Sequence, residues 1–144
     1  MTCMEVGPGK GSYIIEMAKI AFPGTVYAVD ISEKVIKRLK TRISKNKIQN
    51  VEFMVQDASK LDLADNSIDI ILAIACLPEI PRPSDVLREW RRVLKPGGII
   101  SLSEMFPDPD YPLRRTEKKW AAEAGLNFEE QFGNWFIYQL NFKK

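Results

Sequence analysis

The sequence predicts a doubly wound α/β protein with a mostly parallel sheet and a C-terminal antiparallel β-hairpin. Short apolar runs alternate with amphipathic segments along the 144 residues, a glycine-rich turn follows the first run, and two β-type runs flank Gly133-Asn134. Alternating strands and helices predict βαβ units, a parallel sheet and right-handed crossovers. We therefore expect a single domain over residues 1–144.

The first predicted unit is a strand, a turn and a helix. An apolar strand runs from Thr2 to Val6, and the helix that follows the glycine-rich turn ends at Phe22-Pro23-Gly24. One side of this helix carries the apolar residues Ile14, Met17, Ala18 and Ala21. Residues 25–29 form a second strand, whose continuous apolar character is typical of strands buried on both faces, and this strand ends at Asp30.

The second helix is expected to start after Ser32, a good N-cap, and to run to about Asn46 with one apolar stripe. A third strand is expected at 51–55. The polar stretch between this strand and the next has no helical periodicity, which indicates a loop or a short helix.

Strands at 68–74 and 99–103 enclose a helix from about Ser84 to Leu94, and Lys95-Pro96-Gly97-Gly98 is interpreted as the turn into the later strand. A last helix is expected from about Leu113 to Ala124, ending at Gly125.

Two terminal strands, 127–132 and 135–142, complete the predicted hairpin. The three tryptophans, Trp90, Trp120 and Trp135, fall within predicted elements and are interpreted as core residues.

Composition narrows the functional classes. The formal net charge is only +2, which does not indicate a nucleic-acid partner. The chain contains no histidine, and Cys3 and Cys76 form no CxxC pair, so we expect no metal site and no disulfide framework. No apolar run approaches the roughly 20 residues of a membrane span. The cytoplasm is the expected location.

The segment from Glu5 to Gly11 places three glycines between a strand and a helix, where a ligand can approach the backbone and the free amides of the helix N-terminus. A dinucleotide site prefers GxGxxG, and counting from Gly7 puts Ser12 at the third glycine position. Asp30, about 20 residues downstream, is placed to accept hydrogen bonds from a ribose. The glycine spacing disfavours a pyrophosphate ligand, and Asp30 supports an adenosine-containing ligand, either a dinucleotide or another nucleoside cofactor.

Four ordered features resemble the class I S-adenosylmethionine-dependent methyltransferases, which have a Rossmann-like fold. They are Glu5-x-Gly7-x-Gly9-x-Gly11, Asp30, Asp57-Ala58 and Leu94-Lys95-Pro96-Gly97-Gly98. The segment from Asp108 to Arg115 also resembles the ubiquinone and menaquinone biosynthesis C-methyltransferases. The resemblance covers nearly the whole chain.

This resemblance implies S-adenosylmethionine as cofactor, S-adenosylhomocysteine as product, and a role for each matching residue. Glu5 would order the glycine turn and face the methionine end, for which the Gly7-Pro8-Gly9 turn leaves room. Asp30 would hold the ribose and Ile31 would pack against adenine. Asp57 would accept from the adenine amine, the Ala58 amide would donate to a ring nitrogen, and the carbonyl near Ile74 would receive the methionine ammonium.

The same resemblance implies methyl transfer to a small-molecule or lipid-like acceptor. The glycine turn is also similar to that of ribosomal RNA adenine dimethylases, but Ile74-Ala75-Cys76-Leu77-Pro78-Glu79 replaces their Asn-x-Pro-Tyr-type motif, so nucleic acid is not the expected acceptor. Glu79, Glu104 and Tyr111 are expected near the ligand edge, but none is assigned as a catalytic base.

Relatives usually carry an N-terminal helical segment that covers cofactor and acceptor, and this chain is expected to lack it. Three interpretations stay open: a fragment of a longer protein, a minimal enzyme whose open cofactor edge is covered by a partner or a homodimer, or a noncatalytic module that binds the cofactor without turnover. A nicotinamide-dependent oxidoreductase using the same turn and Asp30 is a further class.

Overall fold

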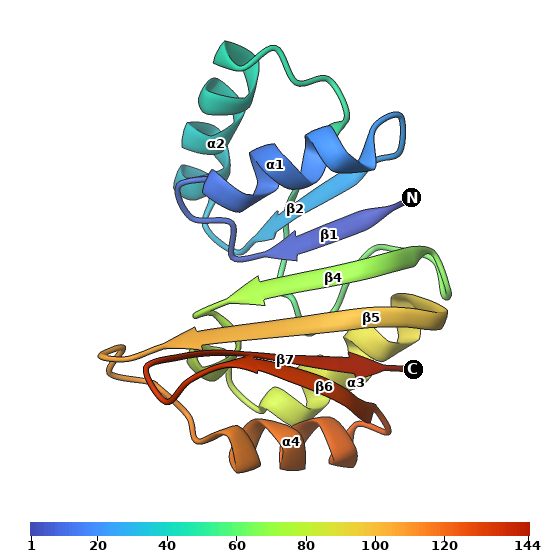
Figure 1. Cartoon of the computed structure of the whole chain (residues 1–144). Coiled ribbons are helices and arrows are strands. Elements are labelled where there is room, and N and C mark those ends of the chain that lie inside the picture. The colour runs from blue at the N-terminus through green and yellow to red at the C-terminus, as the bar shows by residue number, and fades with distance from the viewer.

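A computed structural model describes all residues, 1–144, and shows a seven-stranded sheet with four α-helices (Figure 1). The strands are β1 (Cys3–Val6), β2 (Val26–Asp30), β3 (Val51–Val55), β4 (Ile68–Ile74), β5 (Leu94–Met105), β6 (Asn127–Gly133) and β7 (Ile137–Lys143). The helices are α1 (Ser12–Ala21), α2 (Glu33–Lys45), α3 (Pro83–Val93) and α4 (Arg114–Glu123), with a short 3-10 helix, η1, at Leu77–Glu79. The predicted fold class is confirmed.

The strand order is β3-β2-β1-β4-β5-β7-β6. The first five strands in this order pair in parallel, whereas β7 pairs antiparallel with both β5 and β6. Consequently β7 is the one reversed strand, and it lies between β5 and the edge strand β6. The predicted C-terminal hairpin is confirmed.

Two separate cores show that the sheet is covered on both faces. Successive side chains of a strand point to opposite faces, and Cys3 belongs to a core formed with α1 and α2, whereas its neighbour Met4 belongs to the core that includes α3 and α4. Figure 1 shows α1 and α2 beside β1 and β2, with α3 and α4 near β5 to β7. The carboxyl ends of the parallel strands meet at one edge of the sheet, where the loops after β1 to β4 begin.

Local capping explains the helix that follows β2. Ser32 is the N-cap of α2 as predicted, and its hydroxyl accepts a hydrogen bond from the Val35 amide at 3.4 Å. The buried residues Ile36, Leu39 and Ile43 form the expected apolar stripe.

Two expectations for the C-terminal half are wrong. Lys95-Pro96-Gly97-Gly98 does not precede β5 but lies within it, because Leu94 already pairs with Ile68. The next pair is Ile70 with Ile99, so these four residues form an irregularity opposite one residue of β4. Trp135 lies between β6 and β7 and is 64% exposed, so it is not a core residue. Trp90 is fully buried, and Trp120 packs half-buried against the same core.

Trp90 ties α3 to the loop after β3, because its indole nitrogen donates to the Ala58 carbonyl at 3.0 Å inside the protein. Trp90→Phe should lower the free energy of unfolding by about 1–3 kcal/mol, since it leaves a buried carbonyl without its donor. Urea unfolding measures this loss. Trp120→Phe is the matched control, and an equal loss in both variants would contradict a specific role for the Trp90 hydrogen bond.

Candidate functional site

A cavity of about 490 Å³ lies at the carboxyl ends of β1 to β4, the edge at which open α/β sheets bind ligands. Its volume falls within the range of small-molecule sites. Its lining consists of Val6, Gly7, Gly9, Val29, Asp30, Ile31, Gln56, Asp57, Ala58, Ala75, Cys76, Glu79, Ile80 and Pro81. Six of the nine residues that the sequence predicts for the site therefore share one cavity.

The glycine turn brings backbone to the cavity floor. Gly7 has a φ of +67°, and its amide donates to the Val29 carbonyl at 2.9 Å. A Cβ on Gly7 would lie 2.6 Å from the Cys76 sulfur. Both its conformation and its close neighbour therefore require glycine at this position.

Asp30 closes β2 and has a local structural role as well as a place at the cavity. Its Oδ1 accepts the Ser32 amide at 2.8 Å, which sets the turn into α2. Its second carboxylate oxygen makes no hydrogen bond within the chain and remains available to a ligand. The next residue, Ile31, lines the same cavity and is 75% exposed. Its apolar side chain is therefore free to pack against a bound ligand.

Asp57 and Ala58 follow β3 and line the same cavity. Asp57 Oδ1 accepts the Ser59 amide at 2.8 Å, and this hydrogen bond holds the pKa of Asp57 below its usual range, so the side chain is a carboxylate at neutral pH. Ala58 is buried, and Trp90 fixes its carbonyl. The Ala58 amide makes no hydrogen bond within the chain, so it can donate to a ligand.

The other three predicted residues line an adjoining hollow of about 220 Å³, which shares Gly7 and Gly9 with the main cavity. Glu5, Pro8 and Ile74 are all part of its lining. Glu5 is only 2% exposed, and its Oε2 has no hydrogen-bond partner. Burial raises the pKa of Glu5 to about 8. A buried carboxyl oxygen without a partner fits a site whose ligand supplies a donor or a positive charge.

Of the three residues expected near the ligand edge, Glu79 lines the cavity, whereas Glu104 and Tyr111 do not. Sequence reasoning did not assign the rest of the lining. Gln56 follows β3, and residues 75–81 follow β4. The predicted ends of these two strands could therefore have indicated that both segments lie at the cavity. Among these residues, Cys76 is a free cysteine. Burial and neighbouring carboxylates, Glu79 foremost, raise the pKa of Cys76 to about 12, so it is a thiol rather than a thiolate nucleophile.

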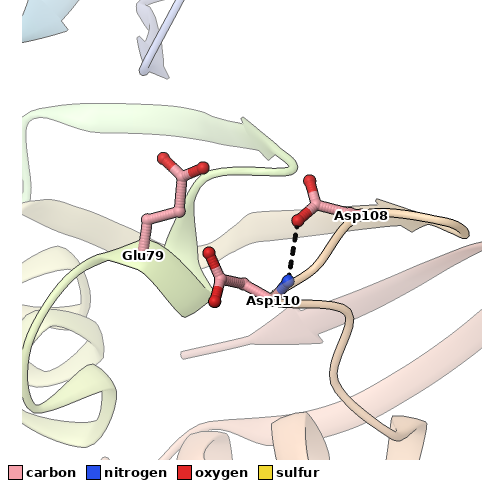
Figure 2. Close-up of side chains that lie close together, drawn as sticks. All are labelled: Glu79, Asp108 and Asp110. Carbon is pink, nitrogen blue, oxygen red and sulfur yellow. Dashed lines mark hydrogen bonds between the residues drawn. The ribbon is translucent and has the colours of Figure 1, made fainter.

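Three carboxylates gather beside the main cavity, as Figure 2 shows for Glu79, Asp108 and Asp110. One oxygen from each lies within 4.8 Å of the others, and the Asp110 amide donates to Asp108 Oδ1 at 2.9 Å. Glu79 comes from η1 and the two aspartates from the segment between β5 and α4. This spacing is compatible with a hard cation, although all three side chains reach solvent, and we assign no metal to it.

The sequence and structure were compared with known proteins. Residues 1–135 match the family model described as a methyltransferase domain. The arsenite methyltransferase of Halobacterium salinarum is 28% identical over 77% of this chain and 29% of its own length. The ubiquinone/menaquinone biosynthesis C-methyltransferase of Ectopseudomonas mendocina is 34% identical over 76% of this chain and 43% of its own length. This chain thus spans less than half the length of these two relatives.

Among solved structures, a SAM-dependent methyltransferase from Aquifex aeolicus superimposes with a TM-score of 0.91, covering 99% of this chain and 81% of that one at 23% sequence identity. The fold, the edge cavity and these similarities place the chain among the class I S-adenosylmethionine-dependent methyltransferases. The chain belongs to the methyltransferase domain family.

Proposed function

We propose that this chain, as one domain, binds S-adenosylmethionine in the edge cavity and transfers its methyl group to a small-molecule or lipid-like acceptor. The observation that carries this proposal is the meeting of Glu5, the glycine turn, Asp30 and Asp57 around adjoining hollows. These residues are far apart in sequence, and only the parallel sheet brings them to one edge. The unpartnered Glu5 oxygen and the free Ala58 amide are the features that fit the cofactor.

The residues divide between two ends of the cofactor. Asp30 takes the ribose hydroxyls with its free carboxylate oxygen, and the exposed Ile31 side chain packs against adenine. Asp57, ionised at neutral pH, accepts from the adenine amine beside the donating Ala58 amide. At the methionine end, Gly7, Pro8 and Gly9 leave room, while Glu5 and the carbonyl near Ile74 meet the ammonium group.

When bound, the cofactor supplies an electrophilic methyl group on sulfonium sulfur. The protein's contribution is to hold donor and acceptor in an aligned geometry, which supplies a large part of the rate acceleration in such displacements. The chain has no histidine, and the Cys76 thiol stays protonated, so neither serves as the base. The residues at the cavity do not identify a catalytic base.

The names of the relatives support a small acceptor, since they describe methylation of arsenite and of quinone precursors. The cavity lining carries three carboxylates and no basic residue, which disfavours a nucleic-acid acceptor. We infer that a second copy or another partner covers this open edge. None of the helices could span a membrane.

We propose a cytoplasmic location on separate grounds, because two free cysteines are typical of a reducing compartment.

The activity is tested by incubating the purified chain with methyl-labelled S-adenosylmethionine and separate acceptors: a hydroquinone, a catechol, an amine and arsenite. Label transfer to one of them, with stoichiometric S-adenosylhomocysteine, is the expected result. If the chain binds the cofactor but transfers no label to any of them, the noncatalytic cofactor-binding module is favoured instead.

Glu5 should make cofactor binding depend on pH. Because its pKa is raised to about 8, most of this side chain is protonated at pH 7, and an arriving ammonium group favours the carboxylate. Binding at pH 7 is therefore expected to release close to one proton and to strengthen as pH rises toward 8. Calorimetry in two buffers with different ionisation enthalpies measures this proton.

Glu5→Gln is the matched control for this prediction, because it preserves the shape of the side chain and cannot ionise. It should release no proton on binding. Equal proton release by Glu5→Gln and the native chain would show that another group accounts for the pH dependence.

A further inference from the structure

Two carboxyl groups are buried together between the sheet and α4, away from the cofactor cavity. Glu104, near the end of β5, is 2% exposed, and Glu117, in the first turn of α4, is 0% exposed. Oε1 of Glu104 and both carboxylate oxygens of Glu117 are sealed from solvent with no hydrogen-bond donor from the rest of the chain. Buried polar atoms almost always have a partner, so this pair requires an explanation.

The neighbouring tyrosine does not supply the missing donor. Tyr138 of β7 is fully buried and borders both carboxyl groups, but its hydroxyl donates to the Pro112 carbonyl at 2.9 Å. A phenol has one proton, so while this bond exists Tyr138 cannot also donate to Glu117.

The charged groups around the pair do not neutralise it. Asp108, from the segment before α4, and Glu79 of η1 add negative charge near Glu104, and the hydroxyl-bearing ring of Tyr111 packs edge-on against Tyr138 at 5.6 Å. On α4, the Arg114 guanidinium lies over the Tyr138 ring, 5.3 Å from its centroid. The acidic side chains outnumber this single cation.

These surroundings act on the acidity of both groups. Burial, and then the charge of Glu117, raise the pKa of Glu104 well above its usual range, and burial likewise raises the pKa of Glu117. Two adjacent carboxylates in a place without water repel each other strongly, whereas a carboxylic acid can donate its proton to a neighbouring carboxylate.

We propose that Glu104 and Glu117 share one proton, and that the resulting hydrogen bond fastens α4, with the 106–113 segment before it, to the sheet. Loss of the proton to a base in solution breaks the O–H bond and leaves two facing carboxylates. Their repulsion opens α4 locally. Since 106–113 carries Asp108 and Asp110, the proton controls a segment that borders the cofactor edge.

The direction of the pH effect follows from the raised pKa values of the two carboxyl groups. Once α4 opens, the carboxyls meet water and give up protons near the ordinary value of 4.5, whereas the closed pair keeps its proton. The stability from this pair is therefore complete below that pH and falls as pH rises through neutral. Opening of α4 should increase about tenfold per pH unit while the closed state holds one more proton than the open state.

Hydrogen exchange of the native chain without any ligand tests whether α4 opens more often as pH rises. The rates are corrected for the intrinsic pH dependence of exchange. Amides of residues 114–123 should lose protection about tenfold per unit between pH 7 and 8, whereas those of β4 should not. Glu104→Gln should remove this pH dependence of protection, because the glutamine side-chain amide donates to Glu117 and carries no titrating proton. Glu16→Gln, at an exposed site on α1, is the control and should keep it.

Infrared spectroscopy provides a readout that does not depend on α4 opening. The native chain at pH 7.5 should show absorption from a protonated carboxyl, and the double variant Glu104→Gln/Glu117→Gln should lack the part that this pair contributes. The proposal is overturned if that absorption is the same in both proteins, or if Glu104→Gln keeps the native pH slope in residues 114–123.

Discussion

Asp30→Ala is expected to weaken S-adenosylhomocysteine binding about 10- to 100-fold, because hydrogen bonds to a charged group contribute about 1.5–3 kcal/mol. S-adenosylhomocysteine retains the ribose that we assign to Asp30, so the loss should appear without turnover. Calorimetry at fixed ionic strength measures the dissociation constant. The same substitution also removes the acceptor for the Ser32 amide, and a second variant must separate the two effects.

Asp30→Asn provides this separation. An asparagine side chain still offers an oxygen to the Ser32 amide, so the turn into α2 should survive, but the negative charge is lost. We expect its affinity to fall between those of the native chain and Asp30→Ala. Asp62→Ala, at an exposed residue outside the cavity lining, should bind as the native chain does. Native affinity in Asp30→Ala would contradict the assigned ribose contact.

Gly7→Ala should both destabilise the protein and abolish detectable cofactor binding. A non-glycine residue in the left-handed conformation costs about 1–2 kcal/mol. The added Cβ would also meet the Cys76 sulfur at 2.6 Å and force backbone or side chain to move. We expect a total loss of about 2–4 kcal/mol in the free energy of unfolding, measured by urea denaturation.

Gly97→Ala separates conformational strain from crowding. Gly97 has a φ of +78°, but a Cβ there would meet nothing within 4 Å, so only the strain remains. Adding Cys76→Ala to Gly7→Ala should restore part of the lost stability by removing the sulfur. If Gly7→Ala is no more destabilising than Gly97→Ala, the close packing between the turn and Cys76 has no energetic consequence.

The parts of the fold that depend on local chemistry were predictable from the sequence. Ser32 caps α2 because its hydroxyl reaches an amide three residues ahead, an interaction within one turn. The site residues were also accessible to prediction, because each lies at or just after the carboxyl end of a strand, and parallel strands bring these ends to one edge. The structure gathers Asp30 and Asp57 as this rule requires.

The features that escaped prediction depend on distant contacts. The glycines at 97 and 98 indicate a turn locally, but Leu94 already pairs with Ile68, so they form an irregularity inside β5 instead of a turn before it. Trp135 has a large aromatic side chain of the kind usually found in a core. It lies in the loop between β6 and β7, however, and its ring stacks on Phe136 at the surface. Glu104 lies on β5 and Glu117 on α4, and their spacing in the sequence does not predict that the two side chains lie close together.

Titration of the purified chain with S-adenosylhomocysteine, alone and in competition with NADH, tests the central claim most directly. The expected result is saturable binding of S-adenosylhomocysteine that NADH does not displace and that Asp30→Ala with Asp57→Ala abolishes. Absence of binding at millimolar ligand, or tight binding of NADH alone, would contradict the assignment of this cavity to S-adenosylmethionine.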